Sequence, residues 1–139
     1  MAKTSVVPAT QDFVDLLKGR LREDDIKEVF AASGEDADRA LQLGFQLSEF
    51  CYVGLLNDRP VTCFGVRRTS MVGDRGIVWL LGTDELKKVK RTFVKESLTY
   101  VRKLQGAFSI LENWVDVRNT FSIKWLQWCG FKFAEKPEP

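Results

Sequence analysis

Histidine is absent from this 139-residue chain, and the absence removes several kinds of catalytic site. Without an imidazole the chain cannot build a Ser-His-Asp triad, and it lacks the commonest protein ligand of zinc. Only three cysteines are present, Cys51, Cys63 and Cys129, and they are widely spaced within apolar segments. We interpret them as reduced core residues of a cytosolic protein. A catalytic thiol is the alternative, but such a thiol usually needs a neighbouring base, which a histidine most often provides.

The sequence also lacks long apolar runs and a strong charge of either sign. It has no run of 18 apolar residues and no amino-terminal apolar segment of the signal-peptide type, so we expect no membrane association. The formal net charge is only +2, so nucleic acid is not an expected partner. Hydrophobic residues make up 45% of the chain, with ten Phe and four Trp. We therefore expect one globular domain over residues 1–139, with a frayed tail at 135–139.

The first third of the chain is predicted to form one edge strand followed by three helices. Val6, Val7 and Pro8 indicate the strand, and Thr10 is a suitable cap for a helix that ends at Gly19. Three sets of apolar residues recur at helical spacing, which predicts the buried faces of the helices. They are Phe13, Leu16 and Leu17, then Ile26, Val29 and Phe30, and finally Ala37, Ala40, Leu41, Gly44 and Phe45.

The rest of the chain alternates between predicted strands and helices. Segments 51–56 and 60–67 form a hairpin, 77–81 a buried central strand, and the helix that follows 87–91 ends at Gly106. A strand at 108–117 leads to a short helix capped by Asn119, and a last strand follows Gly130. The pattern predicts a mixed α/β chain with one sheet and the order β-α-α-α-β-β-β-α-β-α-β.

The helix after Asn119 carries a motif. Asn119, Ser122, Leu126, Gly130 and Phe131 resemble, with matching spacing, the N-x-x-A-x-x-x-Y-x-x-x-G-F signature of the Gcn5-related N-acetyltransferase (GNAT) superfamily. The resemblance implies an α/β (α+β) fold with a single mixed, mostly antiparallel sheet and helices on both faces. It also implies that the sheet splays open after the strand at 77–81, and that acyl-CoA lies in the opening.

A narrower resemblance covers mainly residues 111–133. The run W-V-x-V-x-N-T-x-S-I-x-W-L-x-x-x-G-x-x-F, which begins at Trp114, is similar to small GNAT-like proteins encoded among the head-assembly genes of short-tailed bacteriophages. It implies a non-catalytic internal virion or head-assembly component without a cofactor. Its partners would be phage structural or assembly proteins, and it would be found in the host cytoplasm during infection or in the virion interior. Self-association into a homo-oligomer stays open.

The GNAT resemblance also implies a cofactor site. In the family, the turn after the central strand reads R/Q-x-x-G-x-G/A, and its backbone N–H groups hold the pyrophosphate of CoA. Here the turn has no glycine after Gly82 but is rich in Lys and Arg. One hypothesis is a side-chain clamp for CoA phosphates, and the other is a solvated basic turn that contacts an acidic partner. The predicted cofactor residues are Leu81, Lys87, Lys88, Lys90, Arg91, Thr92 and Asn119.

Acyl transfer to an amine also needs a base and an acid. Glu112 and Asp116 are candidate bases on the predicted fifth long strand, and Asp84 and Glu85 follow the central strand. The family's usual acid is a tyrosine, whereas this chain has Leu126, which has no proton to give. With both motifs altered, we expect a non-catalytic protein, and the alternative is an N-acetyltransferase that uses acetyl-CoA. No metal site is expected.

The four tryptophans have two interpretations as well. Trp79 and at least one of Trp125 and Trp128 are expected to pack in the core. The remaining one, with Phe121, would belong to an exposed patch that marks an interface.

Overall fold

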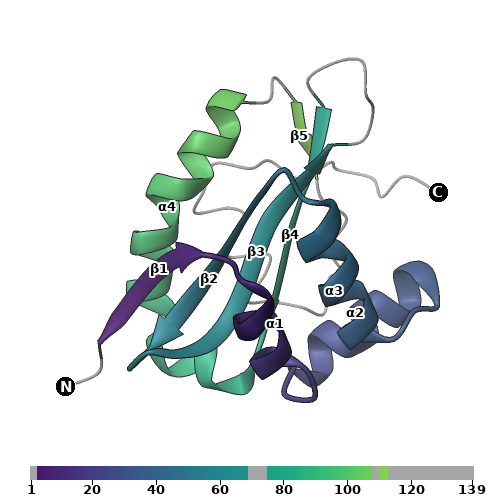
Figure 1. The fold of residues 1–139 in the computed structure, drawn as a ribbon, viewed down its shortest axis with the longest axis horizontal. Helices are drawn as coiled ribbons and strands as arrows, with labels where there is room; N and C mark the ends of the chain where they lie inside the picture. Colours follow the sequence, from purple (N-terminus) through teal and green to yellow (C-terminus); the bar gives the residue numbers. More distant parts are fainter. Residues whose placement is uncertain (1–2, 69–74, 108–109, 113–139) are drawn as a thin grey trace.

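The computed structural model describes residues 3–68, 75–107 and 110–112 (Figure 1). This part of the chain contains strands and helices in the predicted order as far as the fifth strand. They are β1 (Thr4–Pro8), α1 (Gln11–Leu17), α2 (Glu23–Ser33), α3 (Ala37–Leu47), β2 (Phe50–Leu56), β3 (Arg59–Arg68), β4 (Arg75–Gly82), the 3-10 helix η1 (Asp84–Val89), α4 (Lys90–Ala107) and β5 (Ile110–Glu112). The predicted helix and strand between 113 and 133, and the tail at 135–139, lie outside the described residues.

The described strands form one sheet in the order β1-β2-β3-β4-β5. The pairs β1–β2, β2–β3 and β3–β4 are antiparallel, whereas β5 runs parallel to β4, with Arg75 opposite Ile110 and Ile77 opposite Glu112. A parallel pair needs a long crossover connection, and η1 with α4 supplies it. The prediction of a mixed, mostly antiparallel sheet is therefore confirmed.

Helices cover both faces of the sheet, as predicted. α4 lies on one face, and α1, α2 and α3 lie on the other (Figure 1). The side chains of β4 alternate between the two layers, as the pleat of a strand requires. Val78 and Leu80 join the core beneath α4, and Trp79 and Leu81 join the core beneath α1 and α3.

Local signals explain where several elements begin and end. The Thr10 hydroxyl accepts a hydrogen bond from the Phe13 backbone N–H at 3.3 Å, which caps α1 as expected. Gly34 ends α2 with a positive φ of 70°, a conformation that glycine adopts without strain. Asn57 and Asp58 form the tight turn between β2 and β3 with φ of 50° and 67°. The two-residue turn with positive φ angles is the kind that matches the twist of a hairpin.

Two predicted apolar faces differ from the structure. In the predicted stripe on α2, Phe30 is 67% exposed and Ile26 44% exposed, so these two do not lie in the core, whereas Val29 packs against it as predicted. Instead, α2 turns the buried side chains of Arg22 and Asp25 toward the end of β4, as described below. In α1, Leu16 is also exposed, and Val14 takes the buried position beside Leu17.

Smaller differences concern element bounds. β4 begins at Arg75, two residues before the predicted strand, and α4 continues through Gly106 to Ala107. The 3-10 helix η1 was not predicted either. The pattern of apolar residues cannot distinguish it from the first turns of α4.

Candidate functional site

The carboxyl end of β4 is joined to the start of α2 by a buried ion pair. The guanidinium of Arg22 and the carboxylate of Asp25 are 2% and 0% exposed, and their Nη2 and Oδ1 atoms lie 2.7 Å apart. Asp25 Oδ2 also accepts from Arg22 Nε at 3.1 Å and from the Gly82 backbone N–H at 2.9 Å. The Arg22 N–H in turn donates to the Gly82 carbonyl at 2.7 Å. Both ions are thus hydrogen-bonded, which is the condition for burying such a pair.

These contacts fix the last residues of β4 from both sides. The Thr83 N–H donates to the Val61 carbonyl of β3 at 2.8 Å, while both backbone polar groups of Gly82 are bound on the opposite edge by Arg22, which precedes α2, and by Asp25. Thr83 is 2% exposed, and its hydroxyl has no hydrogen-bond partner among the described residues. The chain therefore enters η1 from a rigidly held point.

The second half of β4 has an edge that the described part of β5 does not cover. β5 pairs only with Arg75, Gly76 and Ile77. Backbone polar groups alternate between the two edges of a strand, so those of Leu80 point the same way as those of Gly82, away from β3. Within the described residues no strand lies beside Leu80 on that edge.

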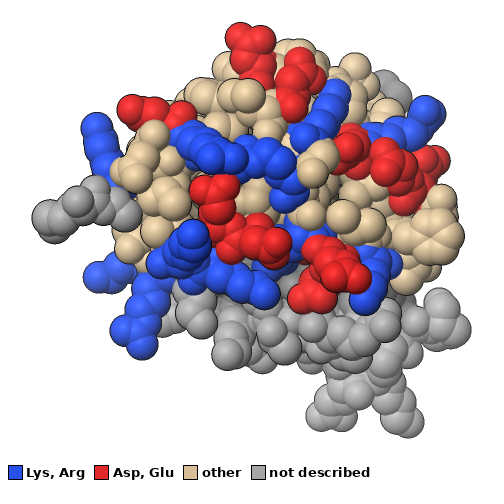
Figure 2. Space-filling model, turned by 90° about the horizontal axis from the view of Figure 1, so that it is seen from below, with Lys and Arg blue, Asp and Glu red and all other residues tan. Residues whose placement is uncertain are grey.

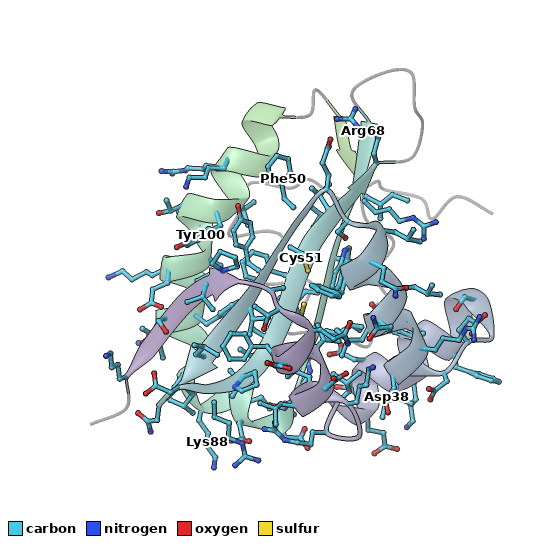
Figure 3. The ribbon with its side chains drawn as sticks, viewed as in Figure 1. Asp38, Phe50, Cys51, Arg68, Lys88 and Tyr100 are labelled. Atoms are coloured by element: carbon cyan, nitrogen blue, oxygen red, sulfur yellow. The ribbon has the colours of Figure 1, made fainter. Side chains whose placement is uncertain are left out.

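The turn after β4 carries the predicted cations. Lys87 and Lys88 lie in η1, and Arg91 and Thr92 lie in the first turn of α4, all of them exposed. Figure 3 shows Lys88 at the end of the molecule where α4 begins, and Figure 2 shows basic and acidic side chains together on this end. Within the described residues, none of the ion pairs involves Lys87, Lys88 or Arg91. These exposed side chains could pair with an anion at this end of the molecule.

The remaining predicted cofactor residues are placed differently. Leu81 is 7% exposed and packs with Val14 and Leu17. Its backbone faces β3, where its carbonyl accepts from the Thr62 hydroxyl at 2.8 Å, so neither its side chain nor its backbone is available to a ligand. The side chain of Lys90 and the whole of Asn119 lie outside what the structure describes. The structure thus brings Lys87, Lys88, Arg91 and Thr92 together at one end of β4, and Leu81 lies at the same end.

The candidate acids and bases are less well placed. Glu85 accepts from Arg20 Nη2 at 2.7 Å and lies 3.6 Å from Arg59 Nη2, so it serves an ion-pair network. Asp84 is exposed at the start of η1. Glu112 is the last described residue of β5, opposite Ile77, but its side chain falls outside the description. Asp116 and Leu126 also lie outside the described residues.

Both tyrosines of the chain lie between the sheet and α4. The rings of Tyr52 and Tyr100 are 4.7 Å apart, and the Tyr100 hydroxyl donates to the Val6 carbonyl at 3.1 Å (Figure 3). Burial raises the pKa of Tyr52 above its ordinary value, and the neighbouring Tyr100 adds to the rise. These phenols are structural groups of the core.

The predictions that Trp79, Cys51 and Cys63 pack in or against the core are confirmed. Trp79 packs in the core beneath α1 and α3, and its indole N–H donates to the Ser48 hydroxyl at 2.7 Å. Cys51 and Cys63 are free thiols with their sulfur atoms 3.5 Å apart, and Cys63 is buried. Trp125, Trp128, Phe121 and Cys129 lie outside the described residues.

Sequence reasoning missed the most deeply buried polar group of the site. Arg22 and Asp25 lie in a charged segment, 20–25, that we predicted to be a linker and a helix start. The only local signal is an Arg and an Asp three residues apart, a spacing that also occurs on solvated helix faces. No group of His, Cys, Asp or Glu side chains in the described part of the chain is arranged to hold a metal ion. None of the helices described is both long and apolar enough to span a bilayer.

Comparison with solved structures identifies the fold. The aminoglycoside N-acetyltransferase AAC(6')-Iy, solved with the bisubstrate analog CoA-S-monomethyl-acetylneamine, matches with a TM-score of 0.62 and 12% identity over 98% of this chain and 95% of its own. The aminoglycoside acetyltransferase AAC(6')-Ib in complex with coenzyme A matches with a TM-score of 0.61 and 15% identity over 94% of this chain and 84% of its own. The chain therefore has the GNAT fold.

The same fold is found under other descriptions as well. A transcriptional regulator from Bacillus halodurans C-125 matches with a TM-score of 0.56 and 10% identity over 99% of this chain and 98% of its own. No protein-family model and no curated protein sequence matches the chain. At such identities the likeness establishes the fold, and function has to be argued from the site itself.

Proposed function

We propose that the chain binds an acyl-CoA at the carboxyl end of β4 and transfers the acyl group to an amine. The observation that carries this proposal is the junction of two features at one place. In the described part of the chain, no strand pairs with the edge of β4 at Leu80, and no ion pair engages the exposed cations Lys87, Lys88 and Arg91, which follow seven to eleven residues later. The strand edge could bind an extended chain of amide groups, and the cations could bind a diphosphate.

The chemistry of CoA fits both features. Its pantetheine arm carries amide groups that can bond to a strand edge, as an added strand does. Its pyrophosphate and ribose phosphate are anions that the Lys and Arg side chains would pair with. Because η1 is wound as a 3-10 helix, its Leu86 N–H donates to the Thr83 carbonyl at 3.1 Å and is not free for an anion. We therefore assign phosphate binding to side chains, in place of the backbone N–H groups that a glycine-rich turn would offer.

Transfer of the acyl group does not require a general acid among the described residues. A general acid or base typically contributes about 10² to 10⁴-fold, so a site that only positions thioester and amine would be slow but active. Glu112 remains the candidate base on the described part of β5.

A titration with CoA tests the binding step. We expect CoA to raise the melting temperature, and a concentration of a hundred times Kd would stabilise the fold by about 2.7 kcal/mol. Pantetheine, which lacks the phosphates, should bind more weakly. The variant Lys87→Ala/Lys88→Ala/Arg91→Ala should lose the preference for CoA over pantetheine, while Arg102→Ala/Lys103→Ala, at the far end of α4, should keep it. If millimolar CoA produces no shift, the proposal is wrong.

Turnover is measured separately, by release of CoA thiol from acetyl-CoA in the presence of a panel of primary amines. Binding without turnover would support the second candidate function. That candidate is a GNAT-fold protein without catalysis that acts in bacteriophage virion assembly through protein contacts. It is favoured by the engagement of Glu85 in ion pairs and by the absence of glycine from the turn. Recovery of head or portal proteins with the tagged chain from infected cells would support it.

A further inference from the structure

Two of the three cysteines of the chain lie next to each other in the sheet. Cys51 on β2 and Cys63 on β3 are free thiols whose sulfur atoms are 3.5 Å apart. Both side chains pack on the side of the sheet that α1 and α3 cover (Figure 3). The two thiols are thus in direct contact, and the function proposed above uses neither of them.

The register of the hairpin explains why the two sulfur atoms meet. Cys51 lies opposite Gly65, and Cys63 lies opposite Val53. Gly65 places no side chain across from Cys51, whose thiol contacts its diagonal neighbour Cys63 instead. A Cβ atom at Gly65 would lie only 3.2 Å from the Cα atom of Cys51, so the two strands approach each other closely here.

The two thiols differ in their access to solvent. Cys51 is partly exposed, whereas Cys63 is completely buried. The hydrogen bond with Cys51 raises the pKa of Cys63 far above its ordinary value, and burial raises it further. Because the thiolate is the reactive form of a cysteine, a small oxidant from solvent reacts with Cys51 and not with Cys63.

We propose that Cys51 and Cys63 form a redox modification site, which a hydroperoxide oxidises to a reversible disulfide. The Cys51 sulfur attacks one peroxide oxygen, the O–O bond breaks, and Cys51 becomes a sulfenic acid while the alcohol leaves. The Cys63 sulfur then attacks the Cys51 sulfur, so that the S–S bond forms and the S–O bond breaks. The Cys63 proton leaves with the displaced hydroxide as water. In total, two thiols lose two electrons and two protons, and the hydroperoxide is reduced to an alcohol and water.

The geometry favours this use of the pair over metal binding. In the part of the chain that the structure describes, no third His, Cys, Asp or Glu joins the two thiols, as a structural zinc site would require. The sulfur atoms of a disulfide are about 2.05 Å apart, so those of Cys51 and Cys63 have to approach by about 1.5 Å. Diagonal neighbours in a sheet are usually about 7–8 Å apart, slightly more than a relaxed disulfide spans. We therefore expect a strained bond that is easily reduced.

Peptide mapping of the full chain after treatment with hydrogen peroxide tests the proposal. Trypsin does not cleave before proline, so the Arg59–Pro60 bond stays intact and one peptide, residues 40–67, contains both cysteines. Cys129 lies in a separate peptide, residues 125–132. After the peroxide is removed, the chain is unfolded and its remaining thiols are labelled with iodoacetamide. We expect peptide 40–67 to have lost two hydrogen atoms and to take up no label, and dithiothreitol to restore labelling of both its cysteines.

Single substitutions separate the two roles. In Cys63→Ala the sulfenic acid on Cys51 should persist and react with dimedone, whereas in Cys51→Ala the same dose of peroxide should leave Cys63 reduced. Cys129→Ala is the matched control and should form the disulfide like the unchanged chain. Circular dichroism verifies that each variant is folded.

Two results of the mapping on the unchanged chain would overturn the proposal, and neither depends on a variant that folds. One is a fully labelled peptide 40–67 at a peroxide dose that oxidises free glutathione. The other is a disulfide that joins Cys51 to Cys129. Neither Cys51 nor Cys63 is among the residues proposed to bind CoA, so failure of one proposal leaves the other intact.

Discussion

The carboxylate of Asp25 joins the start of α2 to the end of β4. It accepts hydrogen bonds from two nitrogens of Arg22 and from the backbone of Gly82, with no exposure to solvent. Removing it would leave a buried guanidinium without its counter-charge, which is much more costly than losing an exposed pair.

We therefore predict that Asp25→Ala lowers the free energy of unfolding by about 3–5 kcal/mol. Asp24→Ala, at the exposed neighbouring position of α2, should change it by less than about 0.5 kcal/mol. Urea denaturation followed by tryptophan fluorescence measures both. Equal effects of the two substitutions would mean that the buried pair contributes nothing beyond a surface charge.

The thiol of Cys63 makes the stability of the fold depend on pH. Its pKa is raised far above the ordinary value, first by the hydrogen bond with Cys51 and then by burial. A group with a raised pKa in the folded state favours folding below its unfolded pKa and loses that contribution at higher pH. For a cysteine, the loss begins near pH 8.5 and amounts to about 1.4 kcal/mol per pH unit.

We expect the free energy of unfolding to fall as the pH rises from 8.5 to 10.5, and to fall less steeply in Cys63→Ala. The difference between the two chains removes the contribution of other groups that titrate in this range. Denaturation curves at a series of pH values provide the measurement. Parallel pH profiles would show that the Cys63 thiol ionises as easily in the folded chain as in the unfolded one.

At the scale of elements, α3 depends on a close approach to the sheet at Gly44. A Cβ atom at this position would lie 2.9 Å from Cζ2 of Trp79, and the indole is held in place by its hydrogen bond to Ser48. Alanine is favoured over glycine inside a helix by about 1 kcal/mol, but overpacking of a core usually costs about 1–3 kcal/mol.

Gly44→Ala should therefore destabilise the chain by about 1 kcal/mol, although alanine has a higher helix propensity than glycine. In a Trp79→Phe background the ring is smaller, and the same substitution should become neutral or stabilising. Thermal unfolding of the four chains of this double-mutant cycle gives the coupling between the positions. Additive effects would mean that the helix and the indole do not touch as described.

The elements of the fold were largely predictable because their ends carry local signals. Thr10, Gly34 and the turn at Asn57 each specify the backbone by their own chemistry, and apolar strands such as β4 need no context. The orientation of α2 was not predictable, because its apolar stripe and its Arg22–Asp25 pair compete for the interior. The pair occupies the interior because Asp25 accepts a hydrogen bond from the backbone N–H of Gly82, a residue 57 positions away.

The candidate site, too, was predictable from the sequence only in part. The cation-rich turn was evident from composition, and its position after the central strand followed from the order of elements. Arg22 and Asp25 were missed because a salt bridge at three-residue spacing has no sequence mark of burial. Leu81 was predicted as a ligand residue, but its side chain lies in the core, since neighbouring residues of a strand face opposite sides.

At the scale of the whole molecule, charge is distributed unevenly: residues 10–49, which contain α1, α2 and α3, have ten acidic and five basic side chains, and residues 84–107, which form η1 and α4, have three acidic and seven basic ones. This separation of charge should be measurable without any binding partner. The pI is near 8.5 and the net charge +2, so a uniform distribution would give binding to a cation exchanger alone at pH 7.5. With acidic α1–α3 and basic α4 on opposite faces, we predict retention on both cation and anion exchangers, because each resin binds one face.

Two variants test the faces separately. Glu23→Lys/Glu35→Lys should lose retention on the anion exchanger. Lys95→Glu/Arg102→Glu should elute from the cation exchanger at lower salt than Lys3→Glu/Arg67→Glu, a control with the same net charge. Equal elution of the last two would mean that total charge alone governs binding, whereas an earlier elution of the α4 variant would show that the face carries the effect.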